Sequence, residues 1–409
     1  MPRLSPFPAL RYTPQAGNLE DVLAPPYDVI DSAQAAELRS RSPYNAVRVV
    51  LPEGGTEDRY AEAAKVLASW KEAGVLAADS EPGVYVYRQE YEQAGTPIAR
   101  LAMFGALDLV PLDRGEVLPH ERTHAGPKRD RLALTLATMT QLSPVFMAGQ
   151  DPEALLLEAL RAATESGEPA ALGCTPDGIR HALWRVVGPS AVELCRIVNR
   201  RPLLIADGHH RYETALEAAR QLGTEEAGKM LVCVVSEADP GLVIQPTHRT
   251  VTALPAEVGE DLLDGLATSF EVAPLGRLSP SDAAVVAATT SSALVLLRTG
   301  EAHALPPRAS GGEEHADPGA AIAAVQFDVC VVRELLDTDA DAAAHDGILE
   351  YHRDPEEAAR RAGDRGAVFL LPPVSLEAVW KATTAGLRLP PKSTYFEPKM
   401  PSGLLYRSL

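Results

Sequence analysis

Five residues that could do chemistry stand together after an apolar run near the middle of the chain. Residues 203–206 (LLIA) read as a strand, an alanine-rich helical pattern runs to residue 223, and between them lie Asp207, Gly208, His209, His210 and Arg211. A strand, a glycine turn and a helix leave backbone N–H groups unpaired at the helix start, and with the helix dipole these groups bind anions. Arginine can also hold a phosphate with two hydrogen bonds. We predict a phosphate-binding turn, with His209 or His210 in the first helical turn.

A second polar stretch, LPHERTHAGPKRD, covers residues 118–130. Residues 120–124 match the zinc-protease pattern H-E-x-x-H, which works because two histidines one helical turn apart face one metal. Pro119 and the pair Gly126-Pro127 leave room for at most one helical turn, so we reject the zinc-protease interpretation. Glu121 beside His120 remains a candidate general base.

A third stretch, LPPKSTYFEPKMPSGLLY, covers residues 389–406. Lys392, Ser393 and Thr394 offer an ammonium and two hydroxyls on a proline-stiffened loop, which is suited to holding a phosphate. The glycines of a Walker loop do not precede them, so this is not a P-loop. Thr247 and His248 follow a predicted strand and are candidate ligand contacts.

Composition limits the classes of function. The chain has 409 residues, with 38 basic and 56 acidic side chains and a net charge of −18. Such a charge disfavours general binding of nucleic acid or of anionic membranes, while a local basic pocket for a small anion stays possible. We find no secretory leader or membrane span and expect a cytoplasmic protein. The four cysteines lie far apart in sequence and are predicted to be buried, reduced thiols.

Hydrophobic periodicity predicts the elements that must position these residues. Helices are expected at 33–42, 56–76, 153–166 and 375–386, and strands at 45–52 and 367–373 besides the one that ends before Asp207. Two strand pairs are expected, one formed by 83–92 with 99–110 and one within 233–251. This alternation indicates an α+β (mixed α/β) protein.

The three motifs together resemble known proteins. D-G-H-H-R after a strand resembles the phosphate-binding signature of the ParB–sulfiredoxin superfamily. The order P-H-E, D-G-H-H-R and P-K-[ST]-T resembles the free L-serine kinases. From APPYDVI to PPKSTYFEPKMPSGL, the chain also resembles a bacterial and archaeal family catalogued as domain of unknown function number one thousand and fifteen.

The resemblance to the kinases implies a nucleotide-binding core at residues 111–251. An α/β extension would precede it at 1–110, and an α/β region would follow at 252–409, whose tail (387–409) returns to the active site. It implies Mg²⁺ with ADP or ATP, and phosphoryl transfer to free serine. This chain carries an N-terminal extension that those kinases lack, and Thr247 and His248 where they place an aromatic side chain, so the identity of the acceptor stays open.

The resemblance also implies a role for each candidate residue. Glu121 would deprotonate the substrate hydroxyl, and Asp207 would transfer a proton or position a metal. The nucleotide phosphates would be held by Gly208, His209, His210 and Arg211. The transferred phosphate or the serine carboxylate would be held by Lys392, Ser393 and Thr394. The substrate would be contacted by His120, Thr247 and His248.

Two other classes of function stay open at this point. One is a metal-dependent phosphatase or other hydrolase with the four ligands His120, His124, His209 and His210. The other is a ParB-like nucleotide-switched binding protein without kinase chemistry. The kinase hypothesis predicts that the three motifs converge on one cleft, because none of them alone supplies a base, a phosphate clamp and an acceptor site.

Overall fold

The computed structural model describes residues 1–55, 58–93, 95–121, 125–254, 261–308, 318–363 and 365–409. The chain divides into two compact units. Unit 1 consists of Met1–Pro119, Thr123–Val243 and Pro398–Leu409, and unit 2 consists of His120–Arg122 and Ile244–Glu397. The D-G-H-H-R motif lies within unit 1, whereas the stretches 118–130 and 389–406 each contribute residues to both units.

Unit 1 is built on a nine-stranded mixed sheet with the order β6-β11-β8-β12-β5-β4-β10-β9, and β1 pairs with β5 off this path. The neighbours β6–β11 and β8–β12 are parallel, and the other pairs are antiparallel. The strands are β1 (Leu4–Ser5), β4 (Gly83–Gln93), β5 (Thr96–Asp108), β6 (Val117–Leu118), β8 (Val145–Gly149), β9 (Ala171–Cys174), β10 (Arg180–Val187), β11 (Leu203–Asp207) and β12 (Lys229–Ser236).

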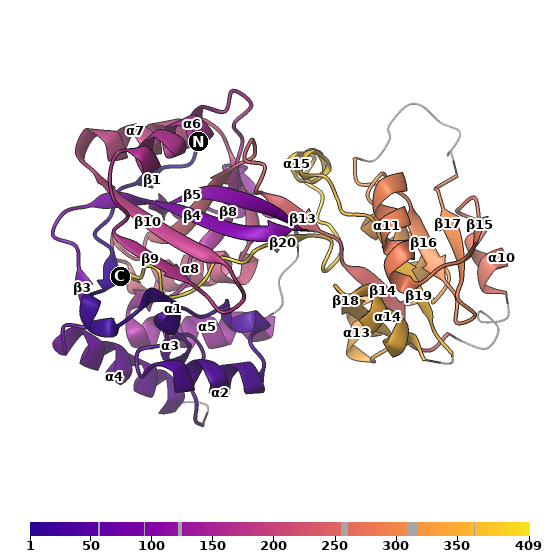
Figure 1. Cartoon of the computed structure of the whole chain (residues 1–409), viewed down its shortest axis with the longest axis horizontal. Helices are drawn as coiled ribbons and strands as arrows, with labels where there is room; N and C mark the ends of the chain where they lie inside the picture. Colours follow the sequence, from indigo (N-terminus) through magenta and orange to yellow (C-terminus); the bar gives the residue numbers. More distant parts are fainter. Residues whose placement is uncertain (56–57, 94, 122–124, 255–260, 309–317, 364) are drawn as a thin grey trace. The chain divides into compact units, whose positions relative to one another are not determined.

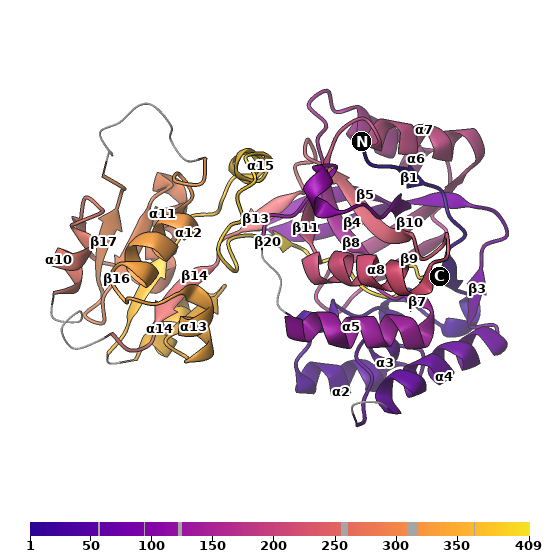
Figure 2. The ribbon, with the colours of Figure 1, turned by 180° about the vertical axis from the view of Figure 1, so that it is seen from behind.

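Helices cover both faces of this sheet (Figure 1). Two amphipathic helices, α6 and α7, lie on one face; α8 lies on the other, with α5 packed on α8 and α4 on α5 (Figure 2). The helices are α1 (Leu19–Val22), α2 (Ser32–Arg41), α3 (Val47–Val50), α4 (Asp58–Glu72), α5 (Ala125–Thr138), α6 (Leu155–Glu165), α7 (Gly188–Val198) and α8 (His209–Leu222). Because both faces are covered, the central strands β8 and β12 are buried almost throughout.

Among the described residues, three short strand pairs lie outside the two large sheets. Two of them belong to unit 1, and the third lies where the chain passes between the units. In unit 1, β2 (Leu10–Tyr12) pairs with β3 (Leu76–Ala78), and β7 (Thr140–Gln141) pairs with β21 (Arg407–Ser408). The strands β13 (Val243–Gln245) and β20 (Tyr395–Glu397) also pair, and the chain passes from one unit to the other at their ends.

Unit 2 contains a six-stranded antiparallel sheet with the order β15-β17-β16-β19-β14-β18. Alanines of α11 and α14 pack with leucines and a valine of β16 and β19 into one core cluster. The strands are β14 (His248–Val251), β15 (Ala273–Arg277), β16 (Ala293–Leu296), β17 (Glu301–Leu305), β18 (Leu349–His352) and β19 (Ala367–Leu370). The helices are α10 (Leu262–Leu266), α11 (Pro280–Thr290), α12 (Ala323–Gln326), a π-helix (Phe327–Arg333), α13 (Ala340–His345), α14 (Pro355–Ala362) and α15 (Leu376–Thr384).

The structure confirms the mixed α/β class and most predicted elements. Helices α2, α4, α6 and α15 and the antiparallel pair β4–β5 lie where the periodicity predicts them. Two predictions are wrong. Residues 45–52 are not a strand: α3 forms there, because the Asn45 side chain accepts from the Val47 N–H and the valines of α3 are buried in apolar clusters. Residues 233–251 contain strands, but these pair with other strands rather than with each other.

The two units differ from the three ranges 1–110, 111–251 and 252–409. Strand β5 of the first range pairs with β12 of the second, so one sheet is shared between them. The tail at 387–409 is divided, with residues up to Glu397 in unit 2 and Pro398–Leu409 in unit 1. The four cysteines are free thiols, and Cys195 and Cys233 are buried as predicted, but Cys174 is exposed because it lies on the edge strand β9.

Candidate functional site

The D-G-H-H-R motif forms a strand–turn–helix in unit 1, as predicted. Strand β11 ends at Asp207, and α8 begins at His209. Gly208 lies between them with φ 97° and ψ 31°, a left-handed conformation that glycine adopts without a steric penalty. His209 and His210 thus occupy the first turn of α8, where backbone N–H groups point out of the helix.

Arg211 holds this turn together from inside. Its side chain is buried, donates to the carbonyl oxygen of Pro144 and pairs with the Asp207 carboxylate at 2.5 Å. The guanidinium folds back over Gly208, so that a Cβ added there would lie 2.9 Å from the Arg211 Nε. The structure thus shows Arg211 as a positioning group for the turn, and its predicted role as a phosphate clamp stays a prediction.

Lys399, which the sequence analysis did not select, is the second cation at Asp207. Its Nζ lies 2.9 Å from Asp207 Oδ1. Two buried polar side chains fix the tail: Arg100 donates to the Pro398 carbonyl, and the Gln89 amide donates to the Lys399 carbonyl. Lys399 belongs to the E-P-K-M stretch of the tail, which offered a lysine in a lysine-poor chain but no indication of its partner.

The charge on Asp207 is fixed by these neighbours. Burial raises the pKa of the carboxyl, but the charges of Lys399 and Arg211 and the hydrogen bond from Lys399 outweigh burial and lower the pKa to about 2. Such a carboxylate is a weak base at neutral pH. The predicted role of Asp207 in proton transfer is therefore less suited to this geometry than a role in fixing the two cations.

In unit 2, the second motif meets the third. His120 is fully buried, and its Nε2 lies 2.6 Å from Thr394 Oγ1 and 3.9 Å from the Glu121 carboxylate. Glu121 forms a parallel bridge with Leu389, whose N–H donates to the His120 carbonyl at 2.7 Å. Glu121 keeps 23 % of its side chain exposed, so it can reach a bound molecule. The structure thus brings together the candidate base and part of the predicted cradle.

Arg249 holds the Lys392 loop in place. Its buried guanidinium donates to the carbonyl oxygens of Thr247, Pro391 and Lys392, and stacks over the Tyr351 ring at 4.7 Å. Burial lowers the pKa of Arg249 to about 10, although nearby Tyr351 and Glu121 oppose that shift. Lys392 itself is exposed and has φ 58°, which is rare for a residue with a Cβ.

The remaining predicted residues have mainly structural surroundings. His248 is buried in β14, where its Nδ1 accepts from the Leu371 N–H at 3.3 Å, and burial lowers the pKa of its ring to about 4. Thr247 is buried too, and Ser393 Oγ donates to the Pro390 carbonyl. Substrate contact by Thr247 and His248 stays a prediction.

Most of the predicted site residues, together with Lys399 and Arg249, form two clusters. The turn cluster of unit 1 consists of Asp207, Gly208, His209, His210, Arg211 and Lys399. The loop cluster of unit 2 consists of His120, Glu121, Arg249, Lys392, Ser393 and Thr394. Convergence of the motifs on one cleft stays a prediction, because the clusters belong to different units.

Metal ligation finds no support among the described residues. They contain no group of three or more His, Cys, Asp or Glu side chains that could hold a metal ion. His124, one of the ligands in the hydrolase hypothesis, lies outside the described residues. In the part of the chain that the structure describes, no helix combines the length and the apolar character needed to cross a bilayer.

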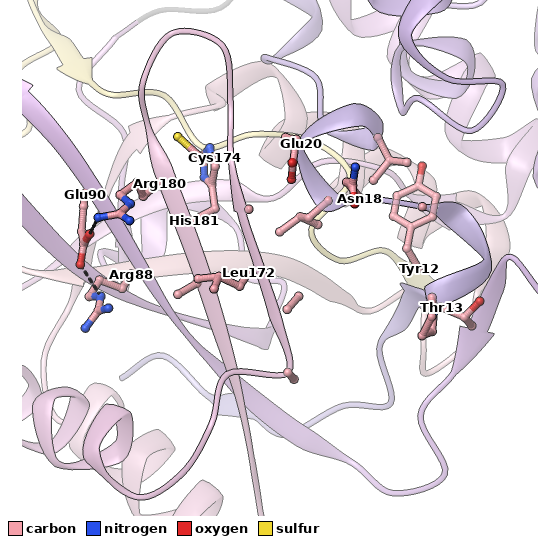
Figure 3. A pocket seen from close by; sticks show the side chains of 18 residues that line it. Tyr12, Thr13, Asn18, Glu20, Arg88, Glu90, Leu172, Cys174, Arg180 and His181 are labelled. Atoms are coloured by element: carbon pink, nitrogen blue, oxygen red, sulfur yellow. Dashed lines mark ion pairs between the residues drawn. The ribbon is translucent and has the colours of Figure 1, made fainter.

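A cavity of about 740 Å³ in unit 1 lies elsewhere (Figure 3). Residues of the N-terminal segment, of β4 and of the β9–β10 hairpin line it. Arg88 and Arg180 both pair with Glu90, at 3.0 and 3.8 Å, so this single carboxylate offsets part of the positive charge at the cavity. The predicted site residues are not among the described residues that line it.

Comparison with known proteins gives a family and distant structural similarities. Solved structures of a free serine kinase mutant in complex with ADP and of a free serine kinase in complex with AMP are both 15% identical to the chain. They give TM-scores of 0.38 and 0.37, and the alignments cover 72% of this chain and 87% and 86% of those chains. SbnI with a C-terminal truncation from Staphylococcus aureus is 12% identical, with a TM-score of 0.37 and coverage of 73% and 85%.

Among curated proteins, no sequence matches the chain. A family model described as "Protein of unknown function (DUF1015)" matches residues 4–333, which is most of the chain. The chain therefore belongs to the DUF1015 family.

Proposed function

We propose that the protein is a nucleotide-dependent phosphotransferase that acts on a small hydroxy amino acid, with free L-serine as the acceptor and ADP or ATP as the donor. The observation that carries the proposal is the turn cluster. A glycine turn opens α8 with two histidines in its first turn, and two cations stand beside them. Phosphoryl transfer needs little covalent help from a protein; it needs neutralised phosphate charge and a positioned nucleophile.

Each cluster has a task in this proposal. The N–H groups at the start of α8, with His209 and His210, would hold the nucleotide phosphates. Lys399 would add positive charge, and Arg211 would keep the turn in shape. We propose the ParB/sulfiredoxin-like relationship for this core on the same feature, the strand–glycine–helix turn.

Glu121 is the proposed general base. Its carboxylate is partly exposed and stands beside a buried histidine, His120, that is held by Thr394. A carboxylate within hydrogen-bond reach of a hydroxyl can accept its proton as the phosphoryl group arrives. Lys392, exposed on the same loop as Thr394, would bind the acceptor carboxylate or the transferred phosphoryl group.

Mg²⁺, which the resemblance to the kinases implies, does not fit Asp207 as a protein ligand. Both oxygens of this carboxylate already bind cations, Lys399 at Oδ1 and Arg211 at Oδ2. In this proposal Mg²⁺ would therefore enter with the nucleotide and not as an ion bound by Asp207.

The test is a panel of ADP, ATP and CTP, each with Mg²⁺ and with L-serine, L-threonine or glycerol as the acceptor, followed by phosphorus NMR. We expect an O-phosphoserine signal with one of the adenine nucleotides. The Glu121→Gln variant, which lacks the proposed base, should give no such signal. Glu377→Gln, on the exposed face of α15, is its control, because it removes a carboxylate outside the site. Tight nucleotide binding without transfer to any acceptor would contradict the proposal and favour the nucleotide switch.

A further inference from the structure

A small cavity lies beside the turn cluster, on the side of α8 that packs against α5, and its lining combines apolar side chains with two arginines. Its volume is about 50 Å³, and it lies wholly within unit 1. It is lined by Tyr27 of the A-P-P-Y-D stretch, by residues of α5 and α8, and by the connection that follows α5. The described residues that line it include two arginines and several hydroxyls, and no aspartate or glutamate.

The two arginines are buried charges. Arg131 is 9 % exposed and Arg211 is 8 % exposed. Each pairs with a carboxylate that is not among the lining residues, Asp130 for Arg131 and Asp207 for Arg211. The Arg131 guanidinium lies 4.0 Å from the centre of the Tyr27 ring. The cavity thus has two positively charged groups in its lining, and the carboxylates that pair with them are not part of that lining.

Tyr27 shows that both cations act at the cavity. Burial raises the pKa of its phenol, and the charge of Arg211, followed by that of Arg131, opposes the rise. An anion in the cavity would therefore meet the field of both guanidinium groups, at a site with little solvent to screen it.

The Thr214 hydroxyl is a second, independent indication that the cavity binds a ligand. It lies on α8 one turn after Arg211, is 4 % exposed and lines the cavity. Its Oγ1 has no hydrogen-bond partner in the part of the chain that the structure describes. A buried hydroxyl without a partner destabilises a protein by about 1–3 kcal/mol, so such groups usually meet a ligand or an ordered water.

We infer that this cavity binds a tetrahedral oxyanion, either inorganic phosphate or the terminal phosphoryl group of a larger molecule. At about 10–15 Å³ for each water-sized atom, the volume suits a ligand of roughly three to five non-hydrogen atoms, and phosphate has five. Arg131 and Arg211 supply charge-assisted donors, and Thr214 supplies a hydroxyl donor. This inference goes beyond the proposed function, since it requires binding and no turnover.

Arg211 connects this oxyanion cavity with the turn cluster. The same guanidinium that holds Asp207 and covers Gly208 also lines the cavity. An anion bound there competes with Asp207 for Arg211, so occupancy is expected to weaken the Arg211–Asp207 pair and to change nucleotide affinity at the turn.

The experiment compares wild type with Thr214→Val and Arg131→Gln, by calorimetric titration with inorganic phosphate against chloride at equal ionic strength. We expect saturable phosphate binding in wild type, about tenfold weaker binding in Thr214→Val, and a larger loss in Arg131→Gln. Without phosphate, the melting temperature of Thr214→Val should stay equal or rise, because the change removes an unpaired buried hydroxyl.

Thr383→Val is the matched control. Thr383 is also a buried threonine within a helix, but its Oγ1 donates to the Val379 carbonyl. This control should lower the melting temperature and leave phosphate affinity unchanged. Phosphate affinity that is equal in wild type and Thr214→Val, or no saturable phosphate binding in wild type, would overturn the inference.

A competition arm separates the two sources of the oxyanion. If ADP displaces phosphate and loses affinity in Thr214→Val, the cavity holds the terminal group of the nucleotide. If ADP and phosphate bind together, the cavity holds free phosphate. Both results support the oxyanion site. Since no arm measures turnover, an enzyme without kinase activity would refute the proposed function and leave this test intact.

Discussion

The turn cluster and the loop cluster are built on the same plan, with one difference. In each, a buried arginine donates to a backbone carbonyl and lies against a residue of positive φ. In unit 1 the Arg211 guanidinium packs over Gly208, and in unit 2 Arg249 donates to the Lys392 carbonyl. Glycine tolerates this conformation, whereas a residue with a Cβ is disfavoured by about 1–2 kcal/mol.

The difference between glycine at 208 and lysine at 392 shows whether the backbone conformation or the side chain matters at each position. At 208 the backbone must be close to the Arg211 guanidinium, and any side chain would be in the way. At 392 the backbone conformation would be easier for glycine, yet the chain has a lysine whose side chain is exposed. Position 208 thus serves the shape of the turn, while the Lys392 side chain is kept at a cost in stability, as is common at functional sites.

The largest effect is expected for Gly208→Ala. The new Cβ would lie 2.9 Å from the Arg211 Nε and would also require a positive φ, so we expect a loss of about 3 kcal/mol in unfolding free energy. Gly223→Ala is the matched control, since that glycine ends the same helix with φ 65° and no atom near its Cβ position. Urea unfolding should show about 1 kcal/mol for the control. Equal losses in the two variants would refute the close packing of Arg211 on Gly208.

A smaller effect on the unfolding free energy is expected when acid protonates Asp207. The pKa of Asp207 is about 2 in the folded protein and about 3.9 in an unfolded chain. Its ion pairs thus add about 2 kcal/mol of stability above pH 4, and this is lost as the pH falls from 4 to 2. Asp207→Asn should be less stable than wild type at pH 6 and should lose less stability on acidification. Parallel stability curves from pH 6 to pH 2 would contradict the ion pairs with Lys399 and Arg211.

The smallest effect has the opposite sign. Lys392→Gly should raise the unfolding free energy by up to about 1 kcal/mol, because glycine relieves the strain at φ 58°. The same change should weaken phosphoryl transfer, since it removes the exposed ammonium group. Lys381→Gly, in the exposed part of α15, should instead destabilise the fold by about 1 kcal/mol. A destabilised Lys392→Gly would show that the lysine is structural.

The sequence predicted the turn but not what holds it. The apolar run 203–206, the glycine and the helical pattern after it are local signals, and local signals suffice for a strand–turn–helix. The ion pair of Asp207 with Lys399 joins residues 192 positions apart, and no local pattern specifies it. The role of Arg249 was missed for the same reason, since its partners Pro391 and Lys392 are more than 140 positions away.

The error at 45–52 has a related cause. Valines at 47, 49 and 50 favour a strand by intrinsic preference. The buried Asn45 side chain donates to the carbonyls of Asp21 and Leu23 and accepts from the Val47 N–H, which fixes a helical turn instead. Tertiary contacts from a distant segment thus override the local preference.

The most direct test of the central claim is the Glu121→Gln variant, measured for nucleotide affinity and for O-phosphoserine formation in parallel. The glutamine keeps the size of the side chain but cannot take a proton from a hydroxyl. If the turn cluster holds the nucleotide and Glu121 is the base, nucleotide affinity should change little while turnover falls about 10²–10⁴-fold. A Glu121→Gln protein as active as wild type would contradict the account.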